Sequence, residues 1–77
     1  MAKKTLANLA TGDRAVVVAV GGDRGFARRL LEMGLLPGTE IAVVRRAPLG
    51  DPLELRLRGY SLSIRGAEAA SIDVETK

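Results

Sequence analysis

Residues 53–65, LELRLRGYSLSIR, carry the clearest pattern in the chain and decide its fold. Apolar and polar residues alternate on both sides of Arg58-Gly59, which is the pattern of two β-strands that each bury one face. A two-residue turn at this dipeptide predicts three facing pairs: Leu57 with Tyr60, Leu55 with Leu62 and Leu53 with Ile64. All six apolar side chains then lie on one face, so we expect a hairpin that packs on a core.

Shorter patterns on either side of this hairpin predict three more strands and two helical turns. Runs of β-branched or alternating residues between turn signals indicate strands, and here they cover residues 15–20, 39–46 and 71–74. Near the start of the chain, Leu6 and Leu9 have the spacing of a helical turn that contacts the core. Residues 67–70, AEAA, predict another such turn.

Residues 25–33, GFARRLLEM, form the one longer helical pattern. Its apolar stripe consists of Phe26, Leu30 and Met33. Asp23 is placed to cap the start of this helix, and Gly34 is placed to end it in the left-handed conformation. Pro37 and Gly38 then predict a turn before the next strand.

These elements predict a mainly β protein with one short inserted helix. A single helix cannot supply the crossovers of a doubly wound sheet, but five short strands can curl into a small antiparallel barrel whose closure protects the strand edges. A chain of 77 residues builds one compact core at most. We therefore expect residues 1–77 to form a single domain.

The composition excludes most chemistry. The chain has no Cys and no His, so it lacks the thiol nucleophile, the commonest general base and the preferred ligands of transition metals. No hydroxyl lies beside a plausible base in the sequence, so we expect no enzyme and no cofactor. We expect no metal site within the chain, and only a weak surface site or one shared between chains stays open. The apolar runs are too short to cross a membrane and no secretory signal is recognisable, which predicts a cytoplasmic protein.

Two binding functions are weighed against structural interpretations of the same residues. The junction GGDRGFARR, residues 21–29, resembles a phosphate-binding turn, but its glycine spacing matches neither known phosphate motif. A small basic barrel is also a common RNA-binding module. Such modules stack bases on exposed aromatic rings, whereas Phe26 and Tyr60, the only aromatic residues, fall on stripes predicted to face the core.

The loop within RRAPLGDPLEL, residues 45–55, is predicted to be stiff. Pro48 holds the preceding residue extended, Gly50 permits a positive φ, and Asp51 can bond its own backbone ahead of Pro52. These features leave Leu49 at the tip of the loop, where it has little core to enter. A stiff loop with an exposed leucine loses little entropy on docking, so we expect a partner contact here.

Three segments, read in order, resemble the FeoA family, small cytosolic accessory proteins of bacterial ferrous-iron uptake. They are RRLLEMGLLPGTEI, APLGDP and LSIRGAEAASIDV, and the resemblance extends from about Leu6 to Val74. It implies an SH3-like small barrel, in agreement with the strand and helix count. It also implies a partner, the FeoB-type permease for Fe(II), which carries a cytoplasmic GTP-binding domain.

The resemblance implies a role for individual residues of this chain that match the family's motifs. Residues expected to build the helix, turn and loop are Met33, Gly34, Pro37, Gly38, Pro48, Gly50 and Pro52. Residues expected to contact the partner are Leu49, Asp51, Arg28 and Arg29. Gly66 departs from the family pattern, which has a longer polar residue before the Ala-Glu-Ala stretch.

The leading hypothesis is a binding module that docks on the permease and supports or regulates it by protein–protein contact. No nucleic acid is expected as a partner, and contact with the membrane is expected only through the permease. Two alternatives stay open at this point: an RNA-binding small β-barrel and a metal-responsive regulatory barrel.

Overall fold

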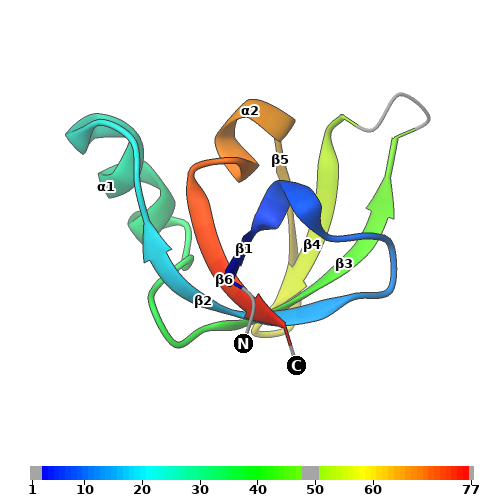
Figure 1. The fold of residues 1–77 in the computed structure, drawn as a ribbon. Coiled ribbons are helices and arrows are strands. Elements are labelled where there is room, and N and C mark those ends of the chain that lie inside the picture. Colours follow the sequence, from blue (N-terminus) through cyan, green and yellow to red (C-terminus); the bar gives the residue numbers. More distant parts are fainter. Residues whose placement is uncertain (1–2, 48–50, 77) are drawn as a thin grey trace.

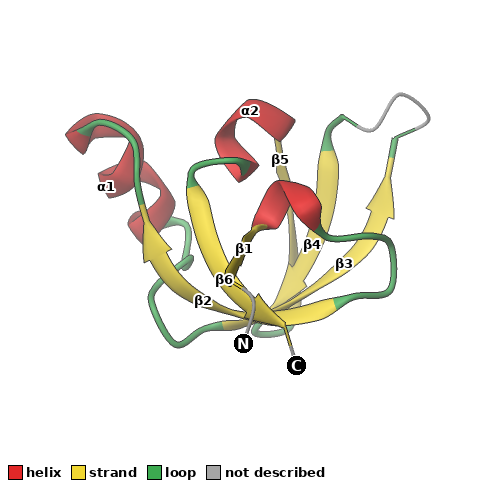
Figure 2. Cartoon of the chain, in the orientation of Figure 1, coloured by secondary structure: helices red, strands yellow, loops and turns green. Residues whose placement is uncertain are grey.

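The computed structural model describes residues 3–47 and 51–76, which form one antiparallel sheet and three short helices (Figures 1 and 2). The strands are β1 (Lys3–Thr5), β2 (Arg14–Val20), β3 (Glu40–Arg46), β4 (Leu53–Leu57), β5 (Tyr60–Ile64) and β6 (Ile72–Thr76). The helices are the 3-10 helix η1 (Leu6–Asn8), α1 (Arg24–Glu32) and α2 (Gly66–Ala69). This architecture confirms the predicted mainly β fold with an inserted helix.

The hairpin of β4 and β5 has the register that the sequence predicts. Leu57 faces Tyr60, Leu55 faces Leu62 and Leu53 faces Ile64. The turn between the strands has positive φ at both central residues, 50° at Arg58 and 83° at Gly59, as a type I′ turn requires. The leucines of β4 and Ile64 are buried, so this hairpin supplies one wall of the core.

The sheet order is β1-β6-β2-β3-β4-β5. The prediction of five strands missed β1, which pairs with β6. The register shifts by one residue where β2 pairs with β6 and again where β3 pairs with β4, and such bulges increase the bend of a sheet. The predicted closure of the barrel is incomplete, because within the described residues β1 and β5 form the two edges and do not pair with each other.

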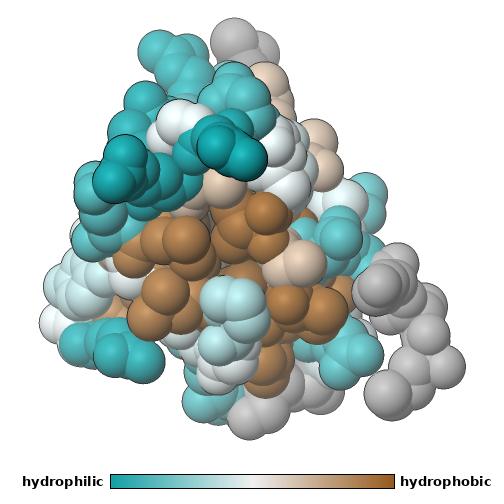
Figure 3. All heavy atoms as spheres, turned by 90° about the vertical axis from the view of Figure 1, so that its left-hand side faces the viewer, coloured by the Kyte–Doolittle hydropathy of each residue, from teal (hydrophilic) through white to brown (hydrophobic). Residues whose placement is uncertain are grey.

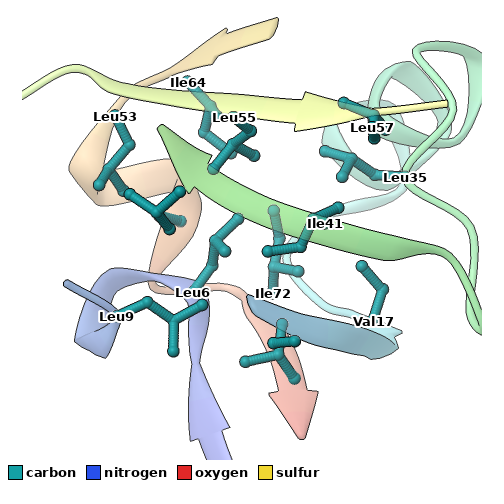
Figure 4. Packing of buried hydrophobic residues seen from close by; sticks show 14 of the residues in the cluster. Leu6, Leu9, Val17, Leu35, Ile41, Leu53, Leu55, Leu57, Ile64 and Ile72 are labelled. Atoms are coloured by element: carbon teal, nitrogen blue, oxygen red, sulfur yellow. The ribbon is translucent and has the colours of Figure 1, made fainter. Parts of the chain in front are cut away.

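Aliphatic side chains fill the space inside the bent sheet (Figure 4). Leu6 and Leu9, from η1 and the residue after it, are fully buried, which confirms the predicted helical turn on the core. Leu30 of α1 and Leu35 are also fully buried. Phe26 is only half-buried and packs against this cluster, so no aromatic ring lies at its centre.

Both ends of α1 are formed as the sequence predicts. A carboxylate oxygen of Asp23 accepts a hydrogen bond from the backbone N–H of Phe26 at 2.8 Å, which caps the first turn. After the last turn, Gly34 has a φ of 100° and donates its N–H to the carbonyl of Leu31, while Leu35 donates to the carbonyl of Leu30. This pair of bonds is a Schellman motif.

Candidate docking surface

The outward side of α1 exposes apolar surface. Figure 3 faces the left-hand side of Figure 1, where α1 lies, and shows apolar atoms gathered at the centre of this face with hydrophilic residues along its upper rim. Leu31 of α1 and Leu36, in the segment that follows it, keep 40% and 39% of their surface exposed. Two large aliphatic side chains at these positions contribute little to the core.

Two arginines of α1 lie beside this apolar surface. A shallow hollow on the helix is lined by Arg24, Gly25, Ala27, Arg28 and Leu31. Within the described residues, the side chains of Arg24 and Arg28 are exposed and form neither an ion pair nor a hydrogen bond. Their positive charge is therefore available to an external group. We call Arg24, Arg28 and Leu31 the α1 surface.

Arg29, the neighbouring arginine, has contacts within the chain. Its guanidinium donates to the carboxylate of Glu68 in α2, forming an ion pair. The same guanidinium lies 6.0 Å from the centre of the Phe26 ring. Its side chain nevertheless keeps 58% of its surface exposed, so the pair contributes little to stability. Arg28 and Arg29, which the sequence groups together, thus have different environments.

Asp51, the other charged residue predicted to contact a partner, also has a contact within the chain. One of its carboxylate oxygens accepts a hydrogen bond of 2.6 Å from the backbone N–H of Gly66, the first residue of α2. At the base of the same loop, Ala47 donates its N–H to the carbonyl of Pro52 at 3.2 Å. The predictions for Pro48, Leu49 and Gly50 lie outside the described residues.

The structure does not bring Arg28 and Asp51 together. α1 lies on one side of the molecule. The end of β3 and the start of β4, which is close to Asp51, lie on the other side, with α2 between them (Figure 1). α2 contacts both sides, through Glu68 toward α1 and through the N–H of Gly66 toward the loop. The predicted partner contacts therefore form two separate surfaces that are joined by α2.

Tyr60 lies on the core-side face of its strand, as predicted, but it is not buried. Its side chain keeps 43% of its surface exposed, although it shares the apolar face of the hairpin. Its hydroxyl donates to the backbone carbonyl of Met33 at the end of α1. Alternation along a strand indicates the face of a side chain but not its depth. Tyr60 lies on the edge strand β5, whereas the residue that faces it, Leu57 on the interior strand β4, is buried.

Two further residues near α1 and α2, Leu36 and Glu68, were not predicted from the sequence. Leu36 precedes Pro37 and lies three positions after the helical pattern of residues 25–33. It is therefore not part of the apolar stripe of that helix, and this was the signal in the sequence that its side chain is exposed. Glu68 lies three residues after Arg65, the spacing of a helix-capping carboxylate. In the structure, Glu68 accepts the N–H of Arg65 at 3.2 Å as well as the guanidinium of Arg29.

Two general features of the described residues bear on function. They contain no cluster of three or more acidic side chains placed to hold a metal ion. In residues 3–47 and 51–76, no helix is long and apolar enough to cross a membrane.

Known proteins resemble this chain in both sequence and structure. The model of the FeoA domain matches residues 4–76. A curated relative from Porphyromonas gingivalis, an Fe(2+) transport protein A/Fe(2+) transporter FeoB fusion protein, is 49% identical over 70 residues. This match covers 91% of this chain and only 8% of the relative.

Two solved structures have the same fold. The FeoA-like protein from Clostridium acetobutylicum is 38% identical, with a TM-score of 0.89 over 99% of this chain and 88% of that chain. A FeoA from Stenotrophomonas maltophilia, solved in complex with zinc and described as a prokaryotic SH3 domain protein, is 32% identical with a TM-score of 0.79. That match covers 92% of this chain and 88% of the other. The SH3-like small barrel is thus confirmed, and the chain belongs to the FeoA domain family.

Proposed function

We propose that this chain is an accessory domain of Fe(II) uptake that binds an FeoB-type permease in the cytoplasm and supports or regulates it by protein–protein contact. The observation that carries this proposal is the fusion of the two proteins in the Porphyromonas gingivalis relative. A fusion keeps two parts at high effective concentration, which favours partners that act together. Contact with the permease requires a surface of this domain that recognises it.

The α1 surface is the proposed contact with the permease. An exposed leucine beside two arginines that have no partner among the described residues fits a patch that combines apolar and acidic side chains. Covering Leu31 removes apolar area from water, and the arginines add selectivity and speed of association through charge. The role is binding and not catalysis.

Titration of the isotope-labelled protein with permease tests this proposal. The partner is added as full-length permease in detergent and, separately, as its soluble GTP-binding domain, both nucleotide-free and GTP-loaded. We expect the amide signals of α1 to shift on binding. Shifts that depend on nucleotide would show that GTP controls the contact, and binding to the full-length protein alone would place the contact on the membrane part.

Variants locate the contact. Leu31→Asp and Arg28→Glu are each expected to weaken binding by about tenfold or more, because each places a negative charge against an acidic patch. Arg45→Glu, which reverses another exposed arginine, on β3, is the control and is expected to leave binding unchanged.

The loop predicted from the sequence is tested in the same assay. Leu49→Asp weakens binding if the loop contributes to the contact. Loss of binding through Leu49→Asp alone would move the docking site from α1 to the loop. Absence of binding to every form of the permease would contradict the proposed function itself.

A further inference from the structure

β5 is an edge strand without the usual protection against pairing. Within the described residues, β4 is its only neighbour in the sheet. Edge strands are commonly blunted by charged residues, proline or a bulge. Tyr60–Ile64 has no charged residue and no proline, and its register with β4 is regular throughout.

The geometry of the hairpin identifies the backbone groups on this edge. In a hairpin with a two-residue turn, the pair next to the turn exchanges hydrogen bonds, and such pairs alternate along the strands. Leu57 and Tyr60 form the pair next to the turn. The N–H and C=O groups of Ser61 and Ser63 therefore point away from β4. Both serines are exposed.

We propose that β5 pairs with β5 of a second copy of this chain, antiparallel and around a twofold axis at Leu62. In this arrangement Ser61 of each copy exchanges main-chain hydrogen bonds with Ser63 of the other. Leu62 faces Leu62, and Tyr60 faces Ile64. The strand is its own complement, since serine meets serine on one face and apolar side chains meet on the other. A second copy is therefore the occupant, and this pairing is independent of the proposed binding to a permease.

The neighbouring registers are worse. A shift that places Ser63 opposite Ser63 also places Ser61 opposite Arg65, but the N–H of Arg65 donates to Glu68 and its carbonyl accepts from Ala69. A shift in the other direction requires Gly59, whose φ of 83° is not that of a strand. Only the register centred on Leu62 uses both groups of both serines.

The same register covers apolar surface. Leu62 is half-buried and Tyr60 is exposed, and both lie on the core-side face of β5. Leu62 lies at a position without main-chain bonds to the second copy, where facing side chains approach most closely. Contact across the axis thus removes leucine and tyrosine surface from water. The short edge predicts a weak dimer that forms at high concentration.

Sedimentation from micromolar to millimolar concentration tests this pairing. The wild type is expected to approach the mass of a dimer, and hydrogen exchange at the amides of Ser61 and Ser63 is expected to slow as it does so. Ser63→Pro removes an N–H that points away from β4, so it leaves the hairpin intact and is expected to abolish the dimer. Its thermal midpoint should stay within a few degrees of the wild type.

Charge pairs test the register even if Ser63→Pro does not fold. In Ser61→Glu/Ser63→Lys, each introduced charge faces an opposite charge of the second copy, and within the chain it faces Arg56 or Glu54 of opposite sign. This variant is expected to dimerise more tightly than the wild type. Ser61→Glu/Ser63→Glu sets like charges against each other across the axis and is expected to stay monomeric.

Two results would overturn the proposal. One is a wild type that stays monomeric at millimolar concentration. The other is protection of the Ser61 and Ser63 amides only after permease is added, which would assign the edge to an extended segment of the permease. Binding of permease by Ser63→Pro at wild-type strength would show that pairing of copies and docking are separate functions.

Discussion

Gly34 follows α1 and lies against Tyr60 and Leu57 of the hairpin. Its φ of 100° is one that side chains with a Cβ rarely adopt. A Cβ at this position would also collide with the hydroxyl of Tyr60, which donates to the carbonyl of Met33. The backbone conformation therefore favours glycine here, and a Cβ would in addition displace the Tyr60 hydroxyl. Gly38 has a similar φ of 92°, but no atom lies within 4 Å of the place where its Cβ would be.

Gly34→Ala is expected to lower the free energy of unfolding more than Gly38→Ala does. The unfavourable backbone conformation costs about 1–2 kcal/mol in each variant, and only Gly34→Ala adds a steric conflict. Unfolding in urea measures both losses. Removing the hydroxyl relieves the conflict, so Gly34→Ala/Tyr60→Phe should lose less than the sum of its single variants. This explanation would be contradicted if Gly34→Ala and Gly38→Ala lost the same free energy of unfolding and if the effects of Gly34→Ala and Tyr60→Phe were additive in the double variant.

At the scale of elements, α2 connects parts of the chain that are distant in sequence. Four residues form this helix, too few to be stable alone. Asp51 accepts the N–H of its first residue, and Glu68 joins it to Arg29 of α1. Gly66, the departure from the family pattern, does not prevent the helix. Its N–H is the group that Asp51 binds.

Asp51→Ala is expected to loosen α2, whereas Asp51→Asn is not. The alanine leaves the N–H of Gly66 without its side-chain acceptor, which costs about 1 kcal/mol at a helix start. Asparagine keeps an acceptor oxygen and removes only the charge. Faster hydrogen exchange at the amides of Gly66 and Ala69 would report the loosening. If Asp51→Asn weakens binding to the permease while the stability of the domain is unchanged, the carboxylate contacts the partner. If hydrogen exchange at Gly66 and Ala69 is no faster in Asp51→Ala than in Asp51→Asn, Asp51 does not hold α2.

The sequence predicts those elements whose pattern is local. The register of β4 and β5 follows from residues 53–65 because one pairing places all the leucines on one face. β1 has no such pattern, since Lys3–Thr5 becomes a strand only by pairing with β6. The exposure of Arg28 follows from its position outside the helical stripe. The contacts of Arg29 and Asp51 span 39 and 15 residues, so they depend on the tertiary fold.

At the scale of the whole molecule, one core joins both ends of the chain. Leu6 near the start and Val74 near the end belong to the same buried cluster as Leu30 of α1 and Leu55 of β4. The N-terminal segment is also held by Arg46, whose guanidinium donates to the carbonyls of Leu9 and Ala7. No part of the described structure has a core of its own, so we expect the domain to unfold as one cooperative unit.

Leu6→Ala tests this cooperativity. Truncating a fully buried leucine costs about 2–5 kcal/mol, a large share of the stability of a domain with about 0.05–0.15 kcal/mol per residue. Leu36→Ala makes the same chemical change at an exposed site and should cost about 0.5 kcal/mol or less. Tyr60 is the only tyrosine and there is no tryptophan, so fluorescence reports on the hairpin and its contact with the end of α1, while circular dichroism reports on all the strands. If the core is shared, Leu6→Ala lowers the urea midpoint equally by both probes, because a change near the N-terminus must destabilise the hairpin as well. Two separate transitions would mean that β1 and η1 detach while the hairpin stays folded.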